Sequence, residues 1–206
     1  MNQITNYFSI PVYIGKIIDP ALAKVQSEIS NAIDDLKSKN KFEKKPGWDP
    51  FTHNLSDTTF TTDFISEYRL ENLLNEIANH VFTYMNMVNT PQQKIRKFLI
   101  TGSWVTQTMK NEYAHVHTHG CHDISGVYYF KTNGEDGNLF FKTPVPQVAM
   151  SYVFGHLPTD VQFQPEVGAI VLFPSWLEHS TRANLTDNER ISVSFNISFA
   201  RHFADE

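Results

Sequence analysis

Cysteine is almost absent from this sequence, which has a single one, Cys121, in 206 residues. One thiol cannot form an internal disulfide, so the fold does not depend on a disulfide framework and suits a reducing compartment. No stretch approaches the ~18 consecutive apolar residues that a membrane-spanning helix needs. The first residues lack the charged start and apolar run of a secretory signal. We therefore expect a soluble, cytoplasmic protein with no membrane partner.

Excess positive charge is also missing, since 17 Lys and Arg stand against 22 Asp and Glu, for a net charge of -5. Proteins that bind nucleic acids neutralise phosphates with Lys and Arg, so this balance argues against a nucleic-acid partner. With 41% hydrophobic and 19% charged residues, the chain is too apolar for intrinsic disorder. A prior of roughly 150 residues per domain predicts a single domain over residues 1–206.

The N-terminal part, residues 1–92, predicts one strand and supporting helices. Residues 7–18 are aromatic and β-branched, and Pro11 favours an edge strand, which would permit a homodimer. Apolar residues at helical spacing predict helices over 20–38 and 64–87, the first with Asp19 as its N-cap.

Between these helices, lysines crowd the segment from Lys37 to Asp57, which also contains Trp48. Such a charge run is typical of a solvated linker. The alternative is a mobile lid over a site, with Trp48 contacting the substrate.

The part from 93 to 200 has the texture of a β protein. Strand-like runs lie at residues 98–109, 124–131, 138–142, 150–154, 161–164, 169–173 and 190–199. Many short strands separated by turn signals predict a sandwich or barrel, with the preceding helices packed outside it.

Histidines gather in one short segment, because four of the nine lie in HVHTHGCH at residues 115–122. On a strand, His115, His117 and His119 would share one face, so that two of them could reach one metal ion. A third ligand must come from elsewhere, and His179, directly after an apolar strand, is the candidate. We interpret Cys121 as incidental, with a soft metal ligand as the alternative.

The last predicted strand has one polar and one apolar face. Its polar face carries Arg190, Ser192, Ser194 and Asn196, and is either solvated or lines the interior of a barrel. In an interior, Arg190 would be a fixed cation able to grip a carboxylate through two parallel hydrogen bonds, with Ser192 adding a hydroxyl. This pattern favours a small anionic co-ligand beside the metal.

Three separated blocks carry a family resemblance. His117-x-His119 followed by ISGVYY at 124–129, then GAIVLFPSWLEH at 168–179, then RISVSFN at 190–196 resemble the 2-oxoglutarate and iron(II)-dependent oxygenases of marine bacteria and their phages. The resemblance implies a mainly β fold, a double-stranded β-helix (a cupin-like jelly roll). It also implies iron held by a His-x-Asp/Glu pair and a distal His, and 2-oxoglutarate held by a downstream Arg. Arg190 follows His179 by 11 residues, and Arg190-x-Ser192 matches the family's Arg-x-Ser.

One ligand departs from that pattern, because His119 stands where the carboxylate is expected. We expect His117, His119 and His179 to bind iron, leaving open positions for the cosubstrate and dioxygen. In one alternative, His119 stays off the metal and water takes its place. In the other, the pair is His115 with His117.

The remaining site residues are expected around this centre. Thr106 and Tyr128 would join Arg190 and Ser192 in contacting 2-oxoglutarate, and Trp176 would join Trp48 in contacting the substrate. No catalytic residue is expected beyond the metal ligands.

The resemblance implies a dioxygenase that uses iron(II), 2-oxoglutarate and O2 to hydroxylate a C–H bond, releasing succinate and CO2. A peptidyl or small-molecule substrate fits the acidic chain. Two alternatives are a three-histidine cupin-type dioxygenase without a cosubstrate, which would not need Arg190, and a non-catalytic jelly roll that binds sugar or metal.

Overall fold

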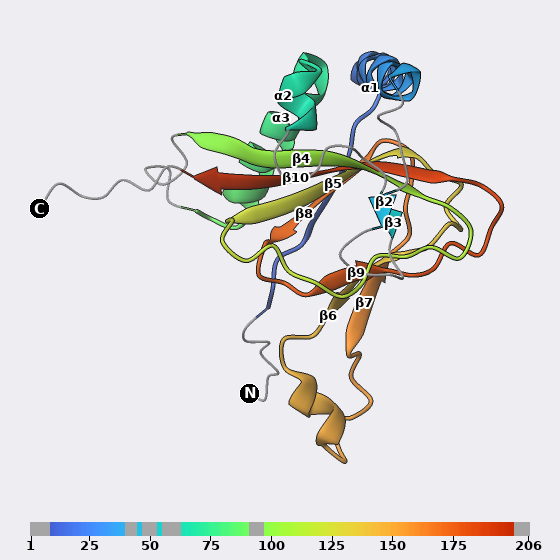
Figure 1. Ribbon diagram of the computed structural model, residues 1–206. Coiled ribbons are helices and arrows are strands. Elements are labelled where there is room, and N and C mark those ends of the chain that lie inside the picture. The colour runs from blue at the N-terminus through green and yellow to red at the C-terminus, as the bar shows by residue number, and fades with distance from the viewer. Residues whose placement is uncertain (1–8, 40–44, 47–52, 55–62, 91–96, 200–206) are drawn as a thin grey trace, which may run out of the picture.

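Two facing antiparallel sheets form the body of the protein (Figure 1). The computed structural model describes residues 9–39, 45–46, 53–54, 63–90 and 97–199. The main sheet has the order β1-β8-β5-β10-β4, with strands β1 (Tyr13–Lys16), β8 (Ala169–Pro174), β5 (Ile124–Lys131), β10 (Arg190–Phe199) and β4 (Phe98–Thr108). The smaller sheet has the order β7-β6-β9, with strands β7 (Asp160–Phe163), β6 (Leu139–Lys142) and β9 (His179–Thr181). A short hairpin pairs β2 (Lys45–Pro46) with β3 (His53–Asn54).

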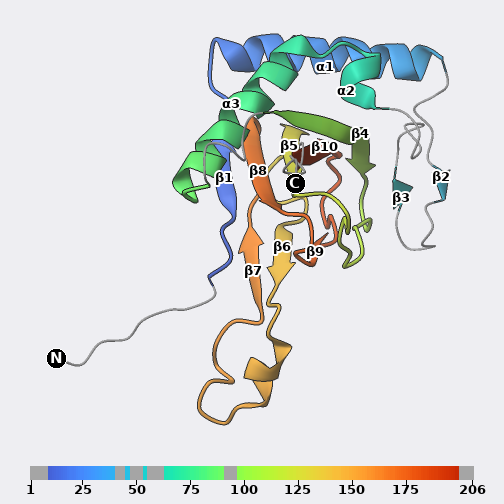
Figure 2. The ribbon, with the colours of Figure 1, turned by 90° about the vertical axis from the view of Figure 1, so that its left-hand side faces the viewer.

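Helices cover one face of the main sheet, and the smaller sheet faces the other (Figure 2). They are α1 (Ala21–Ser38), α2 (Phe64–Glu67) and α3 (Glu71–Met87). Val25, Ile29 and Leu36 of α1 are buried because their helical spacing places them on one stripe. This stripe packs in the same core as Val193 and Phe195 of β10. None of the helices in the described ranges is long and apolar enough to cross a membrane.

Side chains alternate along the strands, so β10 serves two different cores. Val193, Phe195 and Ile197 pack toward the helices. The residues between them face the smaller sheet, where Tyr129, Val171 and Phe173 of the main sheet share a second core with Leu139 and Phe141. The polar face of β10 is therefore an interior surface, as the barrel interpretation predicted: Arg190, Ser192 and Asn196 are all buried.

Two helical expectations are corrected by the structure. The predicted helix over 64–87 is broken at Arg69, whose φ of +49° is left-handed and separates α2 from α3. Asp19 does not cap α1, because the N-cap position is Pro20 and no side-chain cap hydrogen bond forms there. The edge position of the first strand is confirmed, since β1 is the outer strand beside β8.

The predicted strand at 150–154 is also wrong. The segment between β6 and β7 instead forms an arm that projects from the body (Figures 1 and 2), beginning with the 3-10 helix η2 (Pro146–Met150). Met150 and Tyr152 are exposed on it, and apolar residues that reach solvent do not build a strand of a buried sheet.

Candidate metal and cosubstrate site

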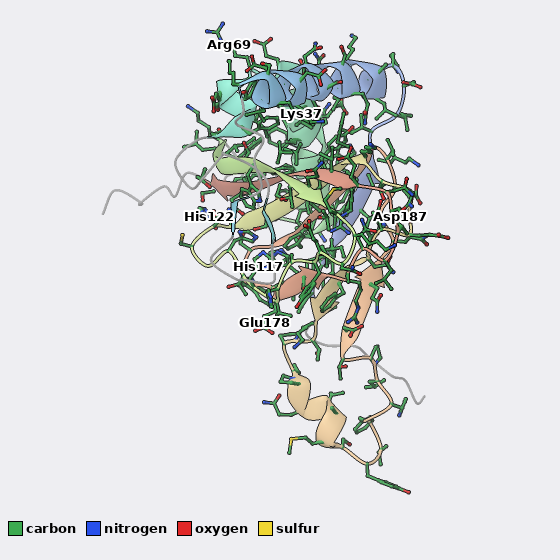
Figure 3. The ribbon with its side chains drawn as sticks, turned by 45° about the vertical axis from the view of Figure 1, so that its right-hand side comes forward. Lys37, Arg69, His117, His122, Glu178 and Asp187 are labelled. Carbon is green, nitrogen blue, oxygen red and sulfur yellow. The ribbon has the colours of Figure 1, made fainter. Side chains whose placement is uncertain are left out.

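Three histidines from two parts of the chain converge between the sheets. His117 and His119 lie in an extended segment between β4 and β5, and His179 begins β9. An isolated antiparallel bridge joins the first to the last: the His117 N–H donates to the His179 carbonyl at 3.0 Å, and the His179 N–H returns the bond at 3.1 Å. Each ring offers one nitrogen such that all three nitrogens lie within 4.8 Å of one another. Figure 3 shows His117 between the sheets, far from the helical layer that carries Arg69.

The other members of the histidine segment do not join this cluster. The ring of His115 packs against Tyr113, with centroids 5.1 Å apart. His122 lies within 2.9 Å of the Thr101 hydroxyl, and Cys121 is exposed. The geometry therefore favours the set His117, His119 and His179 over the register that pairs His115 with His117.

Backbone carbonyls fix the tautomers of two of the rings. The Nδ1–H of His117 donates to the His115 carbonyl at 2.6 Å, and the Nδ1–H of His179 donates to the Leu177 carbonyl at 2.8 Å. A carbonyl can only accept, so Nδ1 carries the proton in both rings and Nε2 keeps its lone pair. Such outer partners orient metal-binding histidines and select the nitrogen that binds.

Burial keeps all three imidazoles neutral at pH 7. Desolvation, with the neighbouring histidines as a smaller cause, lowers the pKa of His179 to about 3 and that of His119 to about 4. Desolvation also lowers the pKa of His117. The ring of Phe173 lies 4.5 Å from that of His179 and contributes to its apolar surroundings. Three converging neutral imidazoles fit a divalent transition metal such as iron(II).

These lowered pKa values predict acid sensitivity of the metal-free protein. A histidine released by unfolding regains a pKa near 6.5, so below that pH the unfolded chain binds more protons than the folded one. The free energy of unfolding is therefore expected to fall as pH drops from 6.5 toward 4. Urea titrations with a chelator present would measure this, and His119→Gln should flatten the slope. A slope unchanged in that variant would contradict the assignment.

Metal binding is expected to stabilise the fold, because the ion would connect the segment after β4 to β9 of the smaller sheet. A ligand at 100 times its Kd adds about 2.7 kcal/mol. For a chain of this size that raises the thermal midpoint by about 5–10 °C. Differential scanning fluorimetry with Co(II) or Zn(II) would record the shift, which His179→Ala should remove. A shift of the same size in His179→Ala would place the ion elsewhere.

Arg190 occupies a buried position at the start of β10. Its Nη1 donates to the carbonyls of Asp136, at 2.8 Å, and Gly137, and its Nη2 donates to the Thr108 hydroxyl at 3.2 Å. Gly137 has a φ of +103°, and a Cβ there would lie 2.2 Å from the Arg182 carbonyl. The turn before β6 therefore requires glycine where it receives the guanidinium.

The strand register places the other cosubstrate candidates. Ser192 lies opposite Thr106 of β4 and Tyr129 of β5, so these three face the interior together. Tyr128 lies on the outer face, where its hydroxyl accepts a hydrogen bond from Gln26 of α1 at 3.0 Å. Tyr128, expected to contact the cosubstrate, therefore faces away from the interior, and Tyr129 is the tyrosine that faces it beside Ser192. Sequence reasoning missed Tyr129 because alternation shows only that two adjacent tyrosines point opposite ways.

The phenol of Tyr129 remains protonated at neutral pH. Burial raises its pKa to about 12, partly opposed by the nearby Arg190. A protonated phenol beside a guanidinium offers a second donor to an anionic ligand.

The three tryptophans lie at different distances from the histidine cluster or outside the described residues. Trp104, which was not singled out in the sequence, has its ring 5.5 Å from the ring of His119 and forms a wall beside the cluster. Trp104 lies two residues before Thr106 on the same strand, so the two side chains share one face, and this spacing could have identified Trp104 from the sequence. Trp176 is 53% exposed, in the turn before β9. Trp48 and most of the lysine-rich segment lie outside the described residues.

Comparison with known proteins shows a family similarity in the part of the chain that holds the histidines. Residues 102–196, which include all three histidines and Arg190, match the family described as "putative 2OG-Fe(II) oxygenase". This stretch is therefore similar to that family over somewhat less than half of the chain. No curated protein sequence matches the chain.

Solved structures of low sequence identity share the fold of the two sheets and their helices. AviO1 from Streptomyces viridochromogenes Tue57 is 14% identical with a TM-score of 0.58, covering 96% of this chain and 92% of its own. A Pseudomonas putida prolyl-4-hydroxylase is 12% identical with a TM-score of 0.59, covering 94% of both chains. HygX from Streptomyces hygroscopicus, with nickel, 2-oxoglutarate and hygromycin B bound, is 15% identical with a TM-score of 0.53, covering 92% of this chain and 83% of its own. The predicted double-stranded β-helix with external helices is confirmed.

Proposed function

We propose that this protein is an iron(II)- and 2-oxoglutarate-dependent oxygenase that hydroxylates a C–H bond of a peptidyl or small-molecule substrate, converting 2-oxoglutarate to succinate and CO2. The observation that carries the proposal is that a buried arginine and a cluster of three neutral histidines face the same interior. A barrel that only bound sugar or metal would not need a buried cation there, and neither would a dioxygenase without a second carboxylate to hold.

His117, His119 and His179 would hold the iron, each through the ring nitrogen that faces the other two. Iron(II), with 2-oxoglutarate and O2, supplies a C–H oxidation coupled to oxidative decarboxylation. The three protein ligands are neutral, so the anionic cosubstrate is the group that balances the metal charge.

Arg190 would bind the carboxylate of 2-oxoglutarate remote from the metal. Among the described contacts, three of its five N–H donors are used by Asp136, Gly137 and Thr108. These contacts would hold the guanidinium plane and leave the remaining N–H donors for the ligand. The Tyr129 phenol, Thr106 and Ser192 lie on the same interior face to complete the carboxylate contacts.

Aromatic side chains would exclude water around the reacting carbon. Trp104 lies against His119 and Phe173 against His179, so the substrate would approach the metal between apolar walls. Trp176, exposed at the end of β8, and Trp48 remain our candidates for contacts with the substrate.

The substrate class is supported by the acidic net charge of -5 and by two structurally similar proteins. One is a prolyl-4-hydroxylase and the other holds hygromycin B. We further propose one domain over residues 1–206, a cytoplasmic location, and a grouping with the oxygenases of marine bacteria and phages. The edge strand β1 would allow a homodimer.

The test begins with spectroscopy. Anaerobic addition of iron(II) and 2-oxoglutarate should produce a visible charge-transfer band, and admission of O2 should release succinate, measured by NMR. O2 consumption that ignores 2-oxoglutarate would favour the cupin-type alternative. If neither the band nor succinate is detected, the protein is a non-catalytic binding protein and the proposal is overturned.

A further inference from the structure

Asn196, near the end of β10, contacts the ring of His119. Its side-chain nitrogen lies 3.4 Å from Nδ1 of that ring. Its side-chain oxygen accepts a hydrogen bond from the Ser125 hydroxyl at 2.8 Å, and Ser125 lies 2.9 Å from the Ser175 hydroxyl. All three polar side chains are buried. A buried polar network is costly unless every member is satisfied, and this one ends on a candidate metal ligand.

His119 differs from the other two histidines in its outer partner. In His117 and His179, Nδ1 donates to the carbonyl two residues earlier. The corresponding carbonyl for His119 is that of His117, which instead accepts the backbone N–H of His179. The amide of Asn196 therefore takes the place that a main-chain carbonyl has in the other two rings.

A β-bulge in the main chain lies beside Asn196. The pairing of β10 with β4 shifts between Asn196 and Ile197, leaving Thr101 as an extra residue on β4. Such bulges redirect side chains beside active sites. The carbonyl of Ser175 also accepts the backbone N–H of His119 at 2.8 Å, so one serine anchors both the main chain of His119 and the network that reaches its ring.

The direction of the amide hydrogen bond determines which nitrogen of His119 is available. In the described arrangement the amide N–H donates to Nδ1, so the proton of the neutral ring is on Nε2. That tautomer is opposite to those of His117 and His179 and does not offer Nε2 to a metal.

We propose that Asn196 is a positioning residue that selects the metal-binding tautomer of His119, an inference that rests on the proposed metal site. On metal binding the amide turns by half a revolution, so that its oxygen accepts the Nδ1–H of His119 and its nitrogen donates to the Ser125 hydroxyl. Ser125 then donates to Ser175. The ring loses one proton from Nε2 and gains one at Nδ1 from solvent, so its charge is unchanged.

Metal affinity tests this role without relying on turnover. Removal of an outer partner typically weakens metal binding by about 10–100-fold, and we expect a loss of this size for Zn(II) and Co(II) in Asn196→Leu. In the His119→Ala background the same substitution should have no effect, because the amide acts through that ring. Ser194→Val, on the same face of β10, is the matched control and should bind as wild type does.

Tautomers give a second readout that a purely structural role would not change. Nitrogen-15 NMR of wild type should show the His119 proton on Nε2 without metal and on Nδ1 with Zn(II). In Asn196→Asp the carboxylate only accepts, so the proton should be on Nδ1 even without metal, and Zn(II) affinity should be at least that of wild type. This variant keeps a polar group at the position, so it provides the test where Asn196→Leu does not fold.

The failures are distinguishable. Equal Zn(II) affinity of wild type and Asn196→Leu, or an equal loss in the His119→Ala background, would overturn the role of Asn196. An unchanged tautomer in Asn196→Asp would do the same. A wild-type protein that binds neither Zn(II) nor Co(II) would overturn the metal site itself.

Discussion

Replacing Arg190 by alanine is expected to weaken 2-oxoglutarate binding by about 30-fold to several thousand-fold. Removing one partner of a buried charge-assisted pair costs about 2–5 kcal/mol, and every 1.4 kcal/mol is about tenfold in affinity. Arg190 is 3% exposed and its guanidinium donates to main-chain carbonyls, so water does not readily take its place. Anaerobic calorimetry with the metal-loaded protein would measure the change.

The same substitution should also lower the free energy of unfolding, because the carbonyls of Asp136 and Gly137 lose their donor. Arg190→Lys, which keeps the charge without the planar fork, separates the two effects. Arg182→Ala is the matched control, because Arg182 is half exposed and pairs with Asp160 at 3.0 Å. Unchanged affinity in Arg190→Ala would exclude this arginine from the cosubstrate site.

The second large effect is expected at His119. His119→Ala should weaken iron binding by about an order of magnitude or more, because it would remove one of the three protein ligands. His119→Asp would restore the family's His-x-Asp pair and should keep iron and some turnover. The metal affinities of the variants would be compared by titration with iron(II) and, separately, by the absorption spectra of their Co(II) complexes.

His115→Ala is the control for this series. Its ring lies outside the cluster, and the carbonyl that holds His117 belongs to the main chain and survives the substitution. Iron affinity equal to wild type in His119→Ala would favour the two-histidine site with water. A large loss in His115→Ala would shift the pair one register toward the N-terminus.

The elements that the sequence predicted well are those with a strong local period. Helix α1 and strands β5, β8 and β10 were predicted within one or two residues, because helical spacing or alternation continues through each of them. β9 was missed, since its three residues, His179–Thr181, are too few to show a period. The arm around Met150 was misjudged for a related reason, because its apolar residues look the same in sequence whether they are buried or exposed.

The site shows the same division. The three histidines and Arg190 could be chosen from residue type, spacing and resemblance. Tyr129, Trp104 and Asn196 could not, because their roles depend on register between strands far apart in the chain. Asn196 pairs with Ser125, 71 positions away, and the contact between them reaches a third segment through Ser175.

The two faces of strand β10 are under different constraints, because alternate residues face the helices and the space between the sheets. Val193 and Phe195 pack toward the helices, whereas Arg190 and Ser192 face the chamber between the sheets. Substitutions at the second set can alter the chemistry of the chamber while leaving the helical layer as it is, so directed evolution should begin at these alternate positions. An insertion or deletion of one residue would exchange the two sets, sending charge into the helical core and bulky apolar groups into the chamber. The strand is thus intolerant of any change in length.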